Sequence, residues 1–319
     1  MKMKHSKKPG KTRRQSATTT TPPNIRKILA TTDFSDESQS GVRYAVALGE
    51  KLGATVALLH VIEPPSRLSG TESVVFARKD SEVVAFAREK LATLAKREGK
   101  GDVTLTSSVR TGKPFHEINT AARESTADLI VIATHGYTGV EHVLLGSTAE
   151  NVVRHAPCSV LTVPTRIAKG PAFRLKKILV PLDFSDLSKD ALPWATFLAA
   201  QFNAEVVLLH VVEKFPIDYL LGRELMSHAI VALMKQAEAD LERAAADLAK
   251  SIGVKISAAV REGKPHEEIC EATKALGADL IVLTTHGYTG LKHVWLGSTA
   301  ERVVRHASCP VLAVRATEA

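Results

Sequence analysis

The chain repeats itself over most of its length. Residues 28–36 recur as residues 178–186, each ending in Asp-Phe-Ser-Asp, and the Thr-His-Gly-Tyr-Thr-Gly of residues 134–139 recurs as residues 285–290. The offset grows only from 150 to 151 residues along the repeat, so the two copies differ by few insertions. A period this long is typical of duplicated domains, because solenoid units are much shorter. The length of 319 residues and the 45% of apolar residues suit two separate cores.

The copies divide the chain into four expected segments. Pro164, Gly170 and Pro171 interrupt the sequence between them. We expect a disordered basic tail over residues 1–24, a first domain over 25–165, a linker over 166–174 and a second domain over 175–316.

The amino-terminal tail concentrates the positive charge of the chain. It holds seven Lys and Arg residues and no acid, so the remainder has a net charge of only +1. The tail lacks apolar periodicity, which predicts disorder. Both a solvated tail without a partner and an arm that binds nucleic acid or an anionic surface are compatible with this composition.

Short apolar runs alternate with longer amphipathic segments in both copies. Residues 128–133, for example, are apolar on both faces of a strand, whereas residues 223–251 are rich in Ala, Leu, Glu and Lys. This alternation predicts two tandem α/β domains, each a doubly wound, five-stranded parallel sheet of Rossmann-like form. The expected strands lie near residues 26–31, 55–62, 103–109, 128–133, 159–163, 177–182, 205–212, 254–260, 279–284 and 310–314.

The sequence favours a cytoplasmic protein. It has neither a run of apolar residues long enough for a membrane span nor the apolar start of a secretory signal. The cysteines Cys158, Cys270 and Cys309 form no CxxC pair. Cys158 and Cys309 align just before the last strand of each copy, which is typical of small buried thiols, with redox chemistry as the alternative.

Ligands of doubly wound sheets bind beyond the carboxyl ends of the strands. After the fourth strand of copy one, nine residues separate Gly136 from Gly146-Ser147-Thr148, and copy two repeats this spacing. A glycine-rich approach to a helix start is typical of phosphate binding. The other interpretation is a capping box, Ser147-x-x-Glu150 and its repeat Ser298-x-x-Glu301, which stabilises a helix without any ligand.

An acidic residue follows the first strand of each copy, as Asp33 and Asp183. At this place a carboxylate can accept hydrogen bonds from ribose hydroxyls or help hold a metal ion. A role in capping the next helix is the alternative, because Ser35 and Asp36 lie at the same turn.

These motifs resemble the universal stress protein family over about nine tenths of the chain. The resemblance rests on Asp-Phe-Ser-Asp, on His-Val after the second strand, on His-Gly followed by nine residues and Gly-Ser-Thr, and on Val-Val-Arg-His-Ala-x-Cys-x-Val-Leu. It implies a stress-response protein that binds ATP, or AMP or ADP, together with Mg²⁺, and acts as a nucleotide-dependent regulator. It also implies that the last strands pair the two copies into an intramolecular pseudo-dimer, with unknown protein partners and further oligomers left open.

The family's nucleotide motif maps onto both copies with departures. Its first glycine is replaced by Ala133 and Thr284, and a β-branched threonine adds bulk there. Copy two keeps a proline two residues before its acid, Pro181, where copy one has Thr31. The two sites are therefore expected to be unequal, with a slight preference for copy one. The resemblance places the nucleotide against Asp33, Val61, Ala133, His135, Gly136, Gly139, Gly146, Ser147 and Thr148, and against Pro181, Asp183, Val211, Thr284, His286, Gly287, Gly290, Gly297, Ser298 and Thr299.

Other chemistries find less support in the sequence. Histidines such as His60 and His210 repeat between the copies, but they fall on separate elements without the spacing of zinc ligands. Neither a Gly-x-Ser-x-Gly elbow nor a Gly-x4-Gly-Lys-Ser/Thr loop occurs, so any enzymatic activity is expected to be at most weak ATP hydrolysis. The lost first glycines leave one alternative open, a scaffold of the same fold that binds proteins or an apolar ligand instead of a nucleotide.

Overall fold

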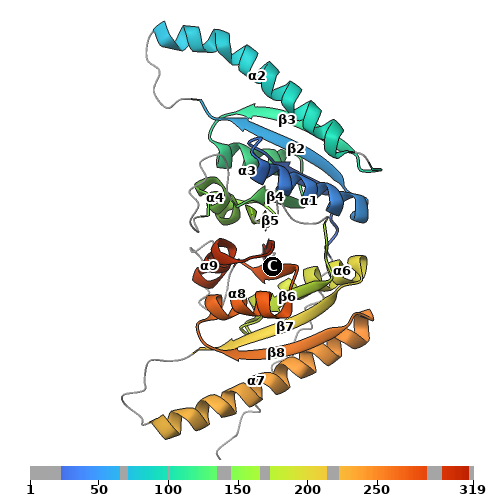
Figure 1. Cartoon of the computed structure of the whole chain (residues 1–319), viewed down its shortest axis with the longest axis vertical. Helices are drawn as coiled ribbons and strands as arrows, with labels where there is room; N and C mark the ends of the chain where they lie inside the picture. Colours follow the sequence, from blue (N-terminus) through green and yellow to red (C-terminus); the bar gives the residue numbers. More distant parts are fainter. Residues whose placement is uncertain are drawn as a thin grey trace, which may run out of the picture.

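The computed structural model describes residues 23–64, 71–99, 101–134, 145–165, 173–213, 223–285 and 297–315. The expected basic tail, apart from its last two residues, lies outside these ranges, and so does most of the expected linker. Figure 1 shows the two copies of the repeat one above the other, and we call the part up to β5 copy one and the part from β6 onward copy two.

Strands and helices alternate along both copies. Copy one consists of β1 (Lys27–Thr31), α1 (Asp36–Leu52), β2 (Thr55–Ile62), α2 (Thr71–Glu98), β3 (Leu105–Thr111), α3 (Pro114–Glu124), β4 (Leu129–Ala133), α4 (Ser147–His155) and β5 (Ser159–Val163). Copy two consists of β6 (Lys177–Pro181), α5 (Asp186–Lys189), α6 (Ala191–Phe202), β7 (Glu205–Val212), α7 (Arg223–Ile252), β8 (Ile256–Glu262), α8 (Pro265–Leu276), β9 (Leu280–Thr284), α9 (Ser298–His306) and β10 (Val311–Val314).

The first helix differs between the copies. Copy one has the single helix α1, whereas copy two divides the same stretch into α5 and α6. Pro193 lies in the first turn of α6, where copy one has Arg43. Because proline has no backbone N–H, it cannot donate to the carbonyl of Lys189, and the helix breaks at that point.

The strands of both copies join into one ten-stranded sheet. Its order is β3-β2-β1-β4-β5-β10-β9-β6-β7-β8, and the neighbouring strands within each copy are parallel. The copies meet where β5 pairs with β10 antiparallel, with Leu161 opposite Leu312. Each copy thus supplies five strands in the predicted doubly wound arrangement, and the last strands pair the copies as expected.

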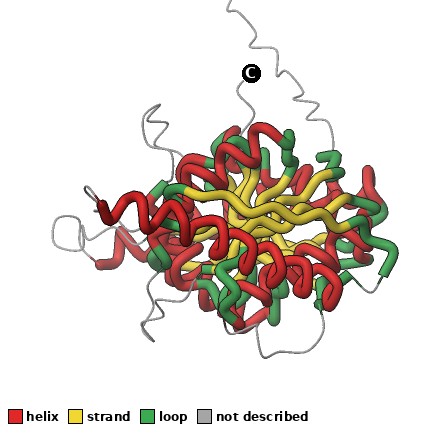
Figure 2. The backbone as a smooth tube through the Cα atoms, turned by 90° about the horizontal axis from the view of Figure 1, so that it is seen from above, coloured by secondary structure: helices red, strands yellow, loops and turns green. Residues whose placement is uncertain are grey.

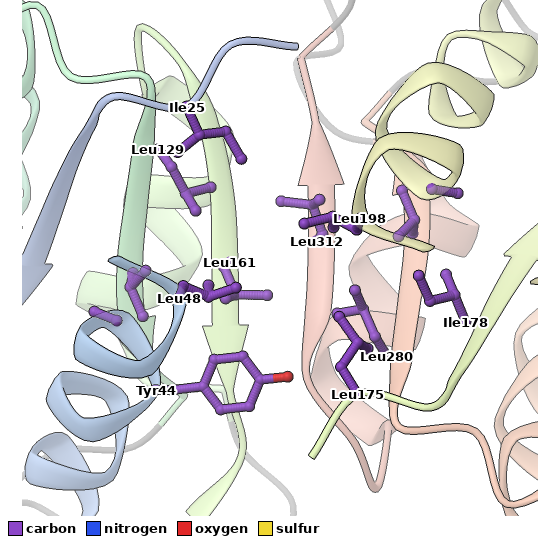
Figure 3. Packing of buried hydrophobic residues seen from close by; sticks show 14 of the residues in the cluster. Ile25, Tyr44, Leu48, Leu129, Leu161, Leu175, Ile178, Leu198, Leu280 and Leu312 are labelled. Carbon is purple, nitrogen blue, oxygen red and sulfur yellow. The ribbon is translucent and has the colours of Figure 1, made fainter. Parts of the chain in front are cut away.

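Helices cover both faces of the sheet, as Figure 2 shows from above. Successive residues of one strand, such as Leu58 and Leu59, are both fully buried because they point into different layers. The first layer lies under α1, α2, α6 and α7, and the second lies under α3, α4, α8 and α9. Both layers therefore continue across the junction of the copies, and Figure 3 shows Leu161 and Leu312 facing one another there.

Tyr44 of α1 also lies at the junction of the copies (Figure 3). Its ring packs edge-on against Phe173, with 4.6 Å between the ring centroids. The hydroxyl is buried and has no hydrogen-bond partner among the described residues. Burial raises the pKa of Tyr44 well above its ordinary value, so the phenol stays protonated.

Candidate functional site

A cavity of about 680 Å³ opens at the carboxyl ends of β6, β7 and β9 in copy two. This is the point where the strand order of copy two reverses, because β6 has β7 on one side and β9 on the other. Ligands of open α/β sheets bind at such switch points. Seven of the residues expected at the copy-two site line the cavity: Pro181, Asp183, Val211, Thr284, Gly297, Ser298 and Thr299.

The structure places the described candidates of copy one on the matching elements. Asp33 follows β1, Val61 lies near the end of β2, Ala133 ends β4, and Gly146 to Thr148 begin α4. The backbone of the helix start also matches, because the N–H of Gly146 donates to the carbonyl of Thr134 over 2.8 Å, as that of Gly297 does to Thr285 over 2.7 Å. The remaining candidates, His135, Gly136, Gly139, His286, Gly287 and Gly290, lie outside the described residues.

The aspartate after the first strand braces a tight turn. Asp33 Oδ1 accepts hydrogen bonds from the backbone N–H of Ser35 over 3.0 Å and from its hydroxyl over 2.5 Å. Ser35, and not the aspartate, caps α1, because its Oγ accepts from the N–H of Ser38. Asp183 repeats both contacts with Ser185 at the same distances. The helix-cap interpretation of this turn therefore applies to Ser35, and the aspartate holds that serine in place.

Between the aspartate and the serine, the backbone adopts a rare conformation. Phe34 has φ of 67° and Phe184 has φ of 60°, both in the left-handed region that side chains with a Cβ seldom occupy. Such a conformation persists only where its surroundings hold it. The ring of Phe34 rests on His60, with centroids 4.2 Å apart, and the ring of Phe184 rests on His210 at 4.4 Å.

The two histidines also form hydrogen bonds with the backbone next to this turn. Nδ1 of His60 lies 2.8 Å from the carbonyl oxygen of Thr32, and Nδ1 of His210 lies 2.7 Å from that of Leu182. Because a carbonyl only accepts, Nδ1 donates in both cases, which fixes the tautomer. The repeat of these histidines thus has a structural explanation. In the described parts of the chain, no three His, Cys, Asp or Glu side chains are grouped to hold a metal ion.

The capping-box interpretation of the Gly-Ser-Thr helix starts is wrong. The N-cap residues are Gly146 and Gly297, which make no side-chain capping bond, so Ser147 and Ser298 occupy the first helical position. The carboxylate of Glu150 also turns away from the helix start and pairs with arginines. A serine cap would have consumed backbone N–H groups at the helix start, which are the groups that bind anions. The helix starts are therefore suited to a phosphate.

Those arginines, which lie in the last turns of α4 and α9, link the two helices to each other. Arg154 of α4 lies 3.1 Å from Glu150 and 3.5 Å from Glu301 of α9. Arg305 lies 3.1 Å from Glu301 and 3.4 Å from Glu150. The four side chains form a ring of alternating charge across the junction, about three tenths exposed. The helices that begin at the two candidate sites are thus in direct electrostatic contact.

Sequence reasoning missed one whole wall of the copy-two cavity. Leu233, Gln236, Ala237 and Asp240 of α7 line it, and Pro265 and Ile269 of α8 complete it. None of these residues belongs to the glycine motif or to the strand ends. Their only sequence signal is their position on the long helix after the second strand, which the motif does not specify.

The cysteines have the properties of structural thiols. Burial raises the pKa of Cys158 and of Cys309 to about 12, so both remain protonated at neutral pH. Cys309 is buried in the layer beneath α8 and α9. The redox alternative therefore gains no support from these two side chains.

Within the described ranges, no helix has both the length and the apolar character that a membrane span requires.

Comparisons with known proteins agree with this architecture. The model of the universal stress protein family matches twice, at residues 24–164 and 174–315. A universal stress protein of Methanocaldococcus jannaschii is 41% identical over 140 residues, which is 44% of this chain and 82% of that protein. One of Mycobacterium tuberculosis is 24% identical over 299 residues, covering 90% of this chain and 96% of the relative.

A solved universal stress protein of Archaeoglobus fulgidus shares the fold along nearly the whole chain. It superimposes with a TM-score of 0.61 at 20% identity and covers 92% of this chain and 97% of its own. Together with the double family match, this extends the likeness over both copies. The chain belongs to the universal stress protein family and carries the family's sequence twice.

Proposed function

We propose that this stress protein binds ATP, or the related AMP or ADP, and acts as a nucleotide-dependent regulator in the cytoplasm. The observation that carries the proposal is the cavity of about 680 Å³ at the switch point of copy two. Its volume lies within the range of small-molecule sites. It brings together a carboxylate, a helix start and apolar strand ends, which are the partners that a ribose, a phosphate and a base require.

Each part of the nucleotide has a matching group in this site. The phosphates face the start of α9 at Ser298 and Thr299, where the backbone N–H groups of the first helical turn and the helix dipole favour negative charge. The ribose lies beside Asp183, whose Oδ1 is already occupied by Ser185 and which is held in place by that contact. The base lies against the end of β7 at Val211.

The cavity lining also fits a bound Mg²⁺. Its described residues include Asp183, Glu213 and Asp240 and neither Lys nor Arg. A triphosphate entering such a site needs a cation to offset the carboxylates, and oxygen ligands together with phosphates are what Mg²⁺ prefers. Mg²⁺ would polarise the phosphates, and this supports at most a weak hydrolysis.

Binding in one copy can affect the other copy through helices α4 and α9. A phosphate held at Ser147 contacts α4, and α4 shares the ring of Glu150, Arg154, Glu301 and Arg305 with α9. A shift of either helix therefore changes the electrostatic energy at the other site. The basic tail lies outside the described residues, and the scaffold is the alternative that the titration below distinguishes.

Calorimetric titration of the full chain with Mg-ATP tests the proposal. Ser147→Trp and Ser298→Trp fill one helix start each without removing a capping bond, because neither serine caps its helix. Each variant should abolish binding to its own copy and leave the other copy unchanged. Ser107→Trp, on the exposed face of edge strand β3, is the matched control. No binding by the unaltered chain at millimolar nucleotide would contradict the proposal and favour a scaffold.

A further inference from the structure

The α7 wall of the copy-two cavity is acidic and polar. Gln236 Nε2 donates to Asp240 Oδ2 over 3.1 Å, and both side chains line the cavity. Arg243 pairs with the other oxygen of Asp240, but it is 70% exposed and does not line the cavity. Solvent screens that outer pair. A ligand in this cavity therefore meets Asp240 in addition to Asp183 and Glu213.

The matching helix of copy one lies on its sheet in the same register. The buried residues Ala87 and Leu91 of α2 correspond to Ala237 and Leu241 of α7, at the offset of 150 residues. The register of these buried positions fixes which exposed positions match. Gln236 thus corresponds to Phe86, and Asp240 corresponds to Lys90.

Lys90 lies beside the Phe34 turn of copy one, and the matching turn of copy two lines the cavity together with Asp240. Its Nζ is 5.6 Å from the centroid of the Phe34 ring and 4.8 Å from that of Phe86. Phe184, the counterpart of Phe34, lines the copy-two cavity together with Asp240. The repeat therefore places opposite charges at matching positions of α2 and α7.

We propose that the side chain at position 90 or 240 sets the ligand charge that each copy prefers. Lys90 strengthens the preference of copy one for the more anionic adenine nucleotides, such as ATP, over the nucleoside, and Asp240 weakens the same preference in copy two. This inference rests on the proposed nucleotide function. It gives the unequal sites a physical cause that lies outside the glycine motif.

The size of the effect follows from Coulomb's law. A swap of Lys90 for aspartate, or of Asp240 for lysine, changes the local charge by two units. Mg-ATP and adenosine differ by two units of charge. With about 8 Å taken between the exchanged side chain and the ligand charge, and in about 0.15 M salt, the change in relative affinity is about fourfold. In about 0.01 M salt the same change rises to about fifteenfold, because the screening length exceeds the distance.

The test titrates the full chain with Mg-ATP and with adenosine in two variants, each of which has one of the two sites blocked. Ser298→Trp leaves copy one to report, and Ser147→Trp leaves copy two. We expect the preference for Mg-ATP over adenosine to be larger in copy one. Lys90→Asp should reduce this preference about fourfold in copy one, and Asp240→Lys should raise it about fourfold in copy two.

Arg88→Asp and Glu238→Lys are the matched controls. They make the same charge changes at exposed positions of the same two helices. Each control lies two residues from the tested position, about 200° around the helix axis. If the swaps alter the preference no more than these controls, the inference fails while the nucleotide function stands. If neither ligand binds in either blocked variant or in the unaltered chain, the proposed function fails, and the inference with it.

Discussion

The charge ring across the junction predicts a salt-dependent loss of stability on replacing Glu150 by glutamine. The Glu150 carboxylate contacts Arg154 at 3.1 Å and Arg305 at 3.4 Å. Its side chain is 29% exposed, and those of the arginines are 32% and 27% exposed. Pairs with this exposure contribute about 0.5 kcal/mol each, so Glu150→Gln should lower the free energy of unfolding by about 1 kcal/mol.

Double-mutant cycles separate the contact within α4 from the contact between the copies. The cycle of Glu150→Gln with Arg154→Met measures the former, and the cycle with Arg305→Met measures the latter. Urea unfolding in about 0.05 M salt should give a coupling of about 0.5 kcal/mol for each pair. In about 1 M salt both couplings should fall below half, because the screening length shrinks to about 3 Å.

A coupling of zero between Glu150 and Arg305 would refute the reasoning. It would mean that the ring holds each helix to itself and does not join α4 to α9. A loss of stability that persists unchanged in high salt would refute it as well, because the cause would then be packing and not charge.

Three further predictions concern buried or partly buried groups. Tyr44→Phe should raise the free energy of unfolding by about 1 kcal/mol in urea unfolding, because it removes a buried hydroxyl without a described partner and keeps the ring against Phe173; a loss would reveal an unseen partner. His210→Phe should lower the free energy of unfolding by about 1 kcal/mol, because the carbonyl of Leu182 loses its donor, and an unchanged stability would contradict the bracing role. The raised pKa of Cys309 implies a contribution to stability that is complete below about pH 9 and lost as the pH rises towards about 12, since the unfolded thiol ionises first. Urea midpoints across this range should fall less steeply in Cys309→Ala, and equal slopes would show that the thiol is not responsible.

The fold was predictable from sequence because its strands are buried on both faces. β4 is apolar throughout, and every residue of β1 and β5 apart from Lys27 is buried, so the positions of these strands were predicted to within one or two residues. The edge strands β3 and β8 begin and end about two residues later than predicted. They carry polar residues on an exposed face, and Arg110 and Arg261 near their ends pair with glutamates of α3 and α8. A prediction that follows runs of apolar residues ends each of these strands before such polar residues.

Only those parts of the candidate site that lie at strand ends or in the glycine motif were predictable from the sequence. Residues at strand ends and at the start of α9 meet at the cavity because parallel strands bring their carboxyl ends to one edge. The capping box failed because a matching spacing of Ser and Glu does not determine where the helix begins, and here the helix begins at the serine itself. Gln236 and Asp240 lie on a helix distant in sequence from the motif, and only the three-dimensional packing of α7 brings them to the cavity.

The central claim, that the repeat builds two adenine-nucleotide sites, is tested most directly by native mass spectrometry of the full chain equilibrated with Mg-ATP. We predict adducts of up to two nucleotides, with one adduct lost in Ser147→Trp, another lost in Ser298→Trp, and none left in the double variant. A chain that carries no nucleotide at about 1 mM ligand, a concentration that detects even weak binding, would contradict the account. Adducts that persist in the double variant would contradict it equally, because the nucleotide would then bind elsewhere.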